Sequence, residues 1–194
     1  SEYARRFMSP LNEVIALNSG HSANMRYAFI PYGLSYVDTL GKVGLKRETM
    51  KVLARGFIWP VGGRIIISSG LGFRSGEFHP GIDIPAERGS IVRAAMEGEV
   101  VYSKFDGGYG NVIDIKHRDS LMTRYGHNTV LFVSKGEYVK KGQIIALAGS
   151  TGNSTGSHVH FEIRYNTVPL NPVEFLPVVK NVVPEMNQPA IAKK

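Results

Sequence analysis

The sequence predicts a mainly β, antiparallel domain of the sandwich or partly closed barrel type, preceded by a short, partly helical N-terminal extension. From Phe57 onward, short β-branched runs alternate with turns rich in Gly, Asp and Asn, which is typical of antiparallel sheets. Most of the 22 glycines fall in this part of the chain, as expected for tight hairpins that need a positive φ. The chain has 43% hydrophobic and 20% charged residues, which is the balance of a globular protein rather than a disordered one.

The expected strands follow one another along this part of the chain. Each is a short run rich in β-branched or aromatic residues and is bounded by glycine or a polar turn residue. The runs lie at residues 64–68, 91–94, 98–103, 111–116, 122–126, 143–149 and 158–165.

Three parts are expected along the 194 residues. Residues 1–55 form the N-terminal extension, or the remnant of a larger N-terminal region, with helices expected at 2–17 and 47–53. Residues 56–177 form the β domain. Residues 178–194 form a proline-containing tail that is expected to be exposed.

Composition limits the chemistry that the chain can perform. There are no cysteines, so any metal must be bound by histidine and carboxylate side chains, and a cysteine nucleophile is excluded. No apolar run reaches the roughly 18–20 residues that span a bilayer, and no signal peptide is visible in this chain, which begins at Ser1. The net charge of +7 favours an anionic partner, which could be nucleic acid, a membrane surface or an anionic wall polymer, or is a general solubility feature. Because Lys and Arg are dispersed, nucleic acid is not expected as a partner.

A histidine and a carboxylate lie four residues apart at His79 and Asp83, on either side of a Pro-Gly turn. Such a turn can bring both side chains to a common point, and imidazole nitrogen and carboxylate oxygen are both good zinc ligands. The alternative, a histidine that is only hydrogen-bonded to a nearby carboxylate, is the commoner arrangement.

Two further histidines, His158 and His160, occupy alternate positions of a predicted strand. Residues i and i+2 of a strand share one face, so both imidazoles point the same way while Val159 and Phe161 point toward the core. Two imidazoles on one face need partners if they are buried. A solvated or hydrogen-bonded pair is the alternative.

The remaining histidines differ in their setting. His127 follows a predicted strand and gains meaning only in combination with the others. His21 lies in a polar stretch and His117 ends a strand beside charged residues, so both are expected at the surface.

Together these residues permit a metal-dependent hydrolysis. With His79, Asp83 and His160 as three ligands, a zinc ion would keep a fourth position for water and activate that water for attack on a peptide carbonyl. His158 shares the strand face of His160 and is placed to act as base and acid. His127 would be the second imidazole, which orients His158 or stabilises the charge of the intermediate.

Residues 57–177 resemble the lysostaphin and LytM type of zinc metallopeptidases, peptidase family M23. The resemblance rests on a series of short motifs in the order of the family, which makes it specific. The motifs are Trp59-Pro60-Val61, Gly72-Phe73-Arg74, His79-Pro80-Gly81-Ile82-Asp83, Gly108-Tyr109-Gly110-Asn111, Tyr125-Gly126-His127, the turn at 136–142, residues 149–156, His158-Val159-His160-Phe161-Glu162 and Asn171-Pro172.

The resemblance implies an endopeptidase that cuts the peptide cross-links of bacterial peptidoglycan. It implies one zinc ion bound by His79, Asp83 and His160, catalytic roles for His127 and His158, and a β core of the barrel-sandwich hybrid type with a duplicated hybrid motif. Members of the family work outside the cytoplasm, so the expected location is the bacterial cell envelope, periplasmic or extracellular. A regulatory partner of unknown identity is compatible with this location.

Arg74 marks a departure from some members of the family. Some members that cut polyglycine bridges carry a tyrosine a few residues before the first ligand histidine, and this chain has none at residues 72–76. Arg74 is similar to the arginine in members from bacteria with an outer membrane, which implies a periplasmic enzyme that binds the carboxylates of stem peptides through Arg74. A surface salt bridge of Arg74 is the alternative.

Three other functions compete with this interpretation. Related domains that lack the ligands act as wall-binding or amidase-activating modules, but all five family positions are occupied here. The turn at 139–143 resembles the turns of lipoyl and biotinyl carrier domains, yet no lysine stands at the exposed hairpin tip that those domains need. A phosphocarrier domain of sugar transport uses two facing histidines without metal and has no need of Asp83.

Overall fold

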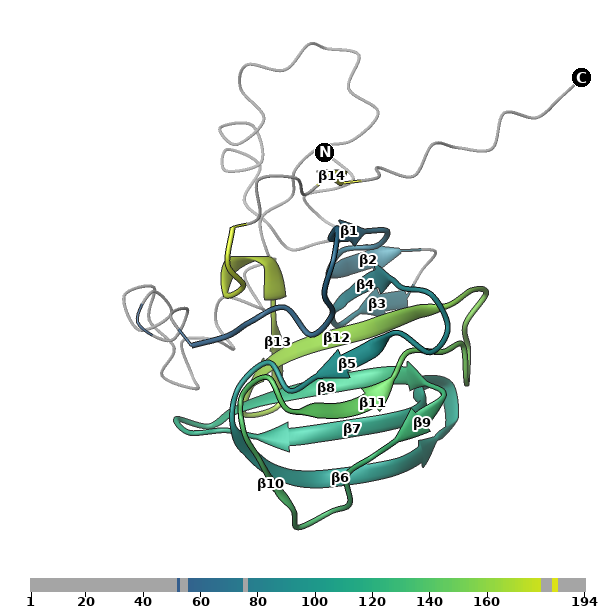
Figure 1. Ribbon diagram of the computed structural model, residues 1–194. Helices are drawn as coiled ribbons and strands as arrows, with labels where there is room; N and C mark the ends of the chain where they lie inside the picture. Colours follow the sequence, from purple (N-terminus) through teal and green to yellow (C-terminus); the bar gives the residue numbers. More distant parts are fainter. Residues whose placement is uncertain (1–51, 53–55, 75–76, 179–182, 185–194) are drawn as a thin grey trace, which may run out of the picture. The chain divides into compact units, whose positions relative to one another are not determined.

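Figure 1 shows a computed structural model of the chain, which describes residues 52, 56–74, 77–178 and 183–184. All of these residues belong to the second of two compact units, Met50–Lys194. The predicted helix at 2–17, the predicted helix at 47–53 apart from Val52, and His21 lie outside the described residues.

Short strands joined by turns make up most of the described residues. In chain order they are β1 (Ile66–Ile67), β2 (Gly72–Arg74), β3 (Glu77–His79), β4 (Ile82–Pro85), β5 (Ile91–Arg93), β6 (Gly98–Asp106), β7 (Gly110–Lys116), β8 (Leu121–Asn128), β9 (Val130–Leu131), β10 (Tyr138–Val139), β11 (Ile144–Leu147), β12 (His158–Tyr165), β13 (Val168–Leu170) and β14 (Val183–Pro184). Two 3-10 helices accompany them, η1 (Gly107–Tyr109) and η2 (Pro172–Glu174). Within the described part, none of the helices has the length and apolar character needed to cross a membrane.

The largest sheet positions the candidate site. Its order is β10-β6-β7-β8-β12-β13, all pairs are antiparallel, and β4 pairs with β12 as well. Strand β12 therefore has β8 along one edge, with β4 and then β13 along the other. In this register His160 of β12 stands between Asp83 of β4 and Gly126 of β8. Figure 1 shows β6, β7, β8 and β12 side by side.

Three smaller sheets complete the described part. Strands β5, β11 and β9 form an antiparallel sheet, β2 and β3 form an antiparallel hairpin, and β1 pairs with β14 in parallel. Strand β14 falls in the segment expected to be an exposed tail, so part of that segment pairs with β1. Its proline pairs with Ile67 in a two-stranded sheet, in which both strands are edge strands, the positions where proline is tolerated. The predicted mainly β, antiparallel class is confirmed.

The alternation of residues in β12 explains both the core and the site. Val159, Phe161 and Ile163 are each 0% exposed, as predicted for the first two, and they face the core. Complete burial of a side chain of this size stabilises a fold by about 1.5–3 kcal/mol. The opposite face of the strand carries His158 and His160, so the energy of core burial holds these imidazoles in place.

The predicted strands agree with the structure where β-branched runs are long. The run at 158–165 coincides with β12, and the runs that begin at 91, 98, 111, 122 and 143 overlap β5, β6, β7, β8 and β11. Of the run at 64–68, only Ile66–Ile67 is a strand. Strands β2, β3, β4, β9, β10 and β13 were not predicted, because runs of two to four residues with Gly, Pro or charged members carry too little periodicity.

His117 is buried, so the surface position predicted for it is wrong. Its exposed fraction is 6%. Its Nδ1 atom lies 2.8 Å from the carbonyl oxygen of Glu97, and its Nε2 atom lies 2.7 Å from the Thr123 hydroxyl. Burial lowers the pKa of His117, against a smaller opposite effect of Glu97. The neighbouring Arg118 and Asp119 are exposed. The surface position of His117 was predicted from these polar neighbours, but adjacent residues can face opposite sides of the chain.

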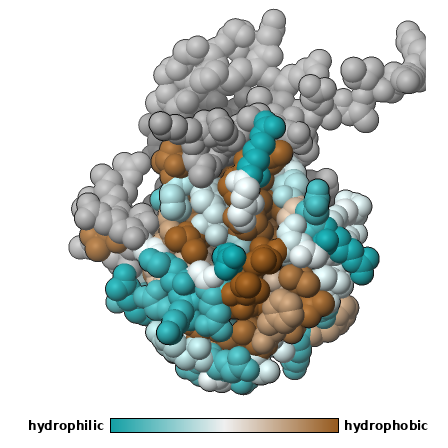
Figure 2. Space-filling view, viewed as in Figure 1, coloured by the Kyte–Doolittle hydropathy of each residue, from teal (hydrophilic) through white to brown (hydrophobic). Residues whose placement is uncertain are grey.

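Apolar side chains also reach the surface of the described part. Ile91, Val130 and Ile144, one from each strand of the sheet β5-β11-β9, are 40–42% exposed. Figure 2 shows apolar side chains gathered near the middle of the face in view. The outer face of this sheet is therefore partly apolar.

Candidate metal centre

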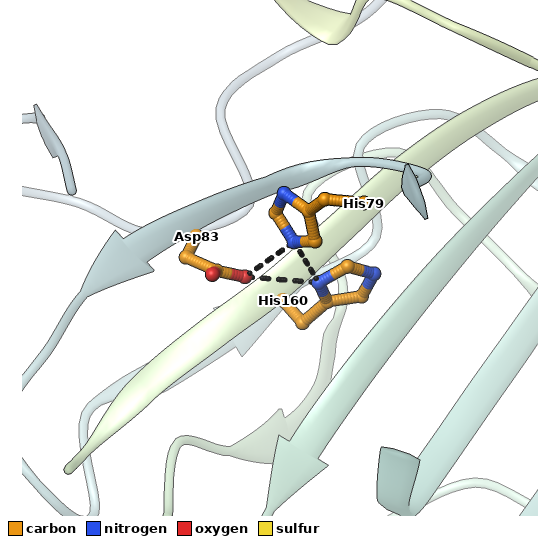
Figure 3. Close-up of side chains that lie close together, drawn as sticks. All are labelled: His79, Asp83 and His160. Atoms are coloured by element: carbon orange, nitrogen blue, oxygen red, sulfur yellow. Dashed lines mark hydrogen bonds and ion pairs between the residues drawn. The ribbon is translucent and has the colours of Figure 1, made fainter. Parts of the chain in front are cut away.

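Three side chains from separate strands converge at β12 (Figure 3). His79 ends β3, Asp83 lies in β4 and His160 lies in β12. Asp83 and His160 are register partners on neighbouring antiparallel strands, and the turn between β3 and β4 brings His79 back to them. All three residues are buried. The structure thus brings together the three residues predicted as metal ligands.

The inward atoms of these side chains form a nearly equilateral triangle. Asp83 Oδ1 lies 3.0 Å from His79 Nε2 and 2.9 Å from His160 Nδ1, and the two nitrogens are 3.0 Å apart. One carboxylate oxygen and two imidazole nitrogens at this spacing could hold a metal ion.

Hydrogen bonds occupy the outward nitrogens of both imidazoles. His79 Nδ1 lies 2.7 Å from the carbonyl oxygen of Gly70, and His160 Nε2 lies 2.9 Å from Oε1 of Glu162. Carbonyl and carboxylate oxygens accept hydrogen bonds, so the proton of each neutral ring is on its outward nitrogen and a lone pair faces inward. Two lone pairs then face a carboxylate oxygen within 3.0 Å. A cation satisfies this arrangement, and the donor set fits zinc.

Burial and hydrogen bonding act in opposite directions on the two carboxylates. Burial alone would raise the pKa of Asp83, but in the metal-free chain the protonated imidazoles of His160 and His79 donate hydrogen bonds to it, and these bonds and the ring charges hold its pKa well below its usual range. Burial likewise opposes ionisation of Glu162, while hydrogen bonds from His160 and Arg164 and their charges lower its pKa to about 2. Both groups are negatively charged at neutral pH, which favours a cation between the imidazoles.

A glycine permits the turn that joins two of the three residues. A Cβ atom at Gly81 would lie 2.4 Å from the carbonyl oxygen of Phe161 and 2.8 Å from Cγ of Glu162. The turn between His79 and Asp83 therefore packs directly against β12, and any larger residue would displace it.

His127 and His158 stand beside the triangle. Their ring centroids are 4.6 Å apart, and those of His127 and His160 are 5.9 Å apart. The Nε2 atom of His158 lies 3.6 Å from Oδ1 of Asp83. Four imidazoles and one carboxylate therefore occupy one small region of the sheet.

Backbone carbonyls fix the tautomers of His127 and His158. His127 Nδ1 lies 2.8 Å from the carbonyl oxygen of Thr151, and His158 Nδ1 lies 2.8 Å from that of Gly156. Each Nδ1 donates, so each neutral ring presents Nε2 as an acceptor. Burial, with a contribution from the charges of the neighbouring histidines, lowers the pKa of His127 to about 4 against the effect of its bond to Thr151. His127 is therefore neutral at neutral pH.

The backbone of His127 is strained at the end of β8. Its φ is 63°, a left-handed conformation that non-glycine residues rarely adopt and that occurs often at functional sites. Thr151 stabilises this region, because its hydroxyl accepts from the Asn111 N–H at 2.9 Å and donates to the Asn128 carbonyl at 2.8 Å. Gly110, with a φ of 64°, leaves room for that hydroxyl.

An open groove of about 840 Å³ lies over the triangle. A smaller hollow of about 340 Å³ shares Asp83, Thr155 and His158 with it, so the depression extends to both sides of these residues. The groove is lined by Phe78, His79, Pro80, Asp83, Asp106, Gly108, Tyr109, His127, Asn153, Ser154, Thr155, His158 and His160.

The groove brings together His79, Asp83, His127, His158 and His160, all of which the sequence had indicated. Arg74 lies in β2, and its side chain is outside what the structure describes.

Sequence reasoning assigned no role to Tyr109, Thr151 or Glu162. The Tyr109 ring lies 5.4 Å from the His160 ring, between centroids. Strand alternation could have indicated Glu162, which follows His160 by two residues on the same face. No local pattern could have indicated Thr151, whose partners lie on β7 and β8.

The match to a known protein family spans all the residues that line the groove. The sequence profile described as "Peptidase family M23" matches residues 77–172. The murein hydrolase activator NlpD of Escherichia coli (strain K12) is 42% identical over 120 residues, which is 61% of this chain and 31% of NlpD. The DD-carboxypeptidase/endopeptidase Mpg of Neisseria meningitidis serogroup B (strain MC58) is 38% identical over 128 residues, which is 63% of this chain and 29% of Mpg. The chain thus spans about a third of the length of these relatives.

Solved structures are similar over the same part of the chain. A zinc-containing peptidase from Vibrio cholerae has a TM-score of 0.56 and 35% identity, covering 60% of this chain and 39% of that one. A mutant catalytic domain of the prophage-encoded M23 protein EnpA from Enterococcus faecalis has a TM-score of 0.54 and 37% identity, covering 60% of this chain and 95% of that one. The profile match and the likeness to almost the whole of a solved M23 domain establish that this chain belongs to peptidase family M23.

Proposed function

We propose that this chain is a zinc-dependent endopeptidase that hydrolyses the peptide cross-links of bacterial peptidoglycan. The observation that carries the proposal is the convergence of three ligand atoms, from His79, Asp83 and His160, in a groove that holds two further imidazoles. A histidine that is only hydrogen-bonded to a carboxylate, the alternative for His79, does not account for a second imidazole lone pair directed at the same oxygen.

The zinc ion would be held by Nε2 of His79, Oδ1 of Asp83 and Nδ1 of His160. When bound, zinc supplies an acidified water and polarises the carbonyl oxygen of the scissile bond. The Asp83 carboxylate offsets part of the positive charge. The Gly70 carbonyl behind His79 orients that ring and increases its basicity.

His158 acts as general base and then as general acid. Its Nδ1 proton is held by the Gly156 carbonyl, so Nε2 can take the proton of the attacking water. The imidazolium that results gives this proton to the departing amine. Nε2 of His158 lies 3.6 Å from Oδ1 of Asp83, so this base stands at the edge of the metal centre.

His127 orients the attacking water. Its proton is on Nδ1, bonded to Thr151, and its pKa of about 4 keeps the ring neutral. Nε2 therefore accepts a hydrogen bond and does not act as a cationic donor to the charged intermediate. This role differs from both roles predicted from the sequence, because the Gly156 carbonyl holds the His158 ring and the neutral His127 ring has its proton on Nδ1.

The shape of the depression favours cleavage within a chain rather than removal of a terminal residue. Space lies on both sides of Asp83 and His158, so an extended peptide can cross the site and continue in both directions. Phe78, Tyr109 and Asp106 line one side, and Ser68, Ser69 and Ser157 line the other. The walls offer aromatic, acidic and hydroxyl contacts to such a peptide.

Peptidoglycan as the substrate is supported by what the relatives are named. NlpD is a murein hydrolase activator, Mpg is a DD-carboxypeptidase/endopeptidase, and a further relative that is 44% identical over 121 residues is an outer membrane antigenic lipoprotein. The proposed location is accordingly the bacterial cell envelope. A role for Arg74 in binding stem-peptide carboxylates belongs to the same proposal.

Activation of another hydrolase is the second candidate function. It is favoured by the 42% identity with NlpD, a named activator. A catalytically silent module would have no need of a base at Nε2 of His158 or of a strained backbone at His127, and this chain has both.

Zinc content and release of muropeptides from purified peptidoglycan test the proposal. The parent chain should bind one zinc ion per chain and release cross-link fragments. His160→Ala should lose zinc and activity, whereas His158→Ala should keep zinc and lose activity. A fully active His158→Ala chain would contradict the mechanism, and a zinc-loaded parent without activity would favour the activator.

A further inference from the structure

Glu162 is the most deeply buried carboxylate near the metal centre, and the proposed mechanism gives it no chemical step. Its side chain is 0% exposed. A buried carboxylate without a compensating role is costly, so its contacts indicate what it does. It lies on β12 two residues after His160, on the same face of the strand.

The contact with His160 distinguishes the two nitrogens of that ring. Nδ1 faces Asp83 and His79, at 2.9 Å and 3.0 Å, while Nε2 lies 2.9 Å from Oε1 of Glu162. An isolated neutral imidazole can carry its proton on either nitrogen. Only the tautomer with the proton on Nε2 leaves Nδ1 free to bind a metal.

The second oxygen of Glu162 is also committed. Arg164 donates from Nε to Oε2, and Arg164 is largely buried. In the sheet register, Glu162 is the partner of Arg124, which is itself bonded through two nitrogens to Asp114. The carboxylate therefore cannot turn away from His160 without breaking an ion pair.

We propose that Glu162 is a positioning residue for the metal centre, because its carboxylate keeps the proton of His160 on Nε2 and so directs the Nδ1 lone pair at the metal. The inference rests on the proposed function, since it takes His160 as a ligand. His79 needs no such side chain, because the carbonyl oxygen of Gly70 holds its outward nitrogen.

The ion pair with Arg164 makes a sharp test possible. In Glu162→Gln, the Arg164 N–H groups attract the amide oxygen, so the amide NH2 faces His160. An NH2 group there favours a proton on Nδ1, the tautomer that cannot bind metal. Replacing Arg164 by Met in the same chain removes this preference and lets the amide oxygen turn back to Nε2.

Zinc affinity of the full chain, measured by competition with a chromophoric chelator, is the first readout. Glu162→Gln should raise the zinc Kd by about 10–100-fold, as expected for a residue behind a metal ligand. The double variant Glu162→Gln/Arg164→Met should recover most of that loss. Asp114→Asn removes a buried carboxylate paired with arginine in the same row of the sheet, and it should change the zinc Kd by no more than about twofold.

Nitrogen-15 NMR of the zinc-loaded parent is the second readout, and it does not depend on how a variant folds. His160 should carry its proton on Nε2, and the resonance of that proton should have the shift of a hydrogen bond to a carboxylate. A proton on Nδ1 of His160, or an unchanged zinc Kd in Glu162→Gln, would overturn this inference and leave the proposed function in place. A double variant that binds zinc no better than Glu162→Gln would overturn the tautomer explanation. A parent chain that binds no zinc would overturn the proposed function, and this inference with it.

Discussion

The Nδ1 atom of His127 lies 2.8 Å from the backbone carbonyl oxygen of Thr151, a residue 24 positions further along the chain. This bond fixes an imidazole whose own backbone has a φ of 63°. The Thr151 hydroxyl at the same time bridges Asn111 on β7 and Asn128 on β8. The hydroxyl of this threonine thus links β7 to β8, and its carbonyl holds the His127 ring that faces the groove.

Replacing Thr151 by Val should lower activity without removing zinc. Valine keeps the shape of threonine but leaves the Asn111 N–H and the Asn128 carbonyl without partners, so the free energy of unfolding should fall by about 1–3 kcal/mol. Because the carbonyl of residue 151 is then less firmly held, we expect kcat for muropeptide release to fall at least about tenfold. Urea unfolding, metal analysis and steady-state kinetics check these three quantities. Thr151→Ser keeps the hydroxyl and is the control; a Val variant with the parental kcat would contradict the role of Thr151.

Binding of zinc should stabilise the folded chain. The ligand triangle brings together residues from β3, β4 and β12, which are not held at this spacing in the unfolded chain. A free zinc concentration of one hundred times Kd should therefore add about 2.7 kcal/mol to the free energy of unfolding. Calorimetry of the metal-free parent, with and without zinc, should show a higher Tm with zinc. His160→Ala should show a much smaller rise, and equal rises in both proteins would place the metal elsewhere.

His117 should make the fold less stable as the pH falls. Burial lowers the pKa of the folded-state imidazole, whereas the unfolded chain titrates near its ordinary value of about 6.5. Below that pH the unfolded chain takes up a proton that the folded chain does not, so the free energy of unfolding declines toward the folded-state pKa. Urea unfolding between about pH 7 and 5 should have a smaller pH dependence in His117→Phe than in the parent. An identical pH dependence in the two proteins would contradict the assignment.

The long strand β12 shows what a sequence can predict here. Its alternation separates Val159 and Phe161, both 0% exposed, from His158 and His160 on the other face. Period-2 patterning is strongest in such runs because burial acts on every second residue. The turn that joins His79 to Asp83 was predicted from a different local signal, the Pro-Gly pair at positions 80 and 81.

Features that depend on contacts between distant segments could not be predicted in this way. His117 has polar neighbours, yet its partners are Glu97 and Thr123, and the resulting burial leaves no periodic signal in the sequence. Thr151 lies in a glycine-rich loop that indicates a turn and nothing about β7 or β8. Local patterns report local geometry, while hydrogen bonds across the sheet depend on the completed fold.

Replacing Gly81 by Ala should disrupt the metal centre while leaving most of the core intact. The added Cβ atom would lie 2.4 Å from the Phe161 carbonyl oxygen, which belongs to the backbone of β12 and cannot move aside cheaply. The turn between His79 and Asp83 must then shift away from β12, so their ligand atoms separate from His160. We expect the zinc Kd to rise at least about tenfold and the free energy of unfolding to fall by about 1–3 kcal/mol, as for other overpacked sites. Gly62→Ala is the matched control, because no atom lies within 4 Å of the added Cβ there. Chelator competition and urea unfolding of both variants decide the matter: a Gly81→Ala chain that binds zinc like Gly62→Ala would mean that the two ligands do not depend on this turn.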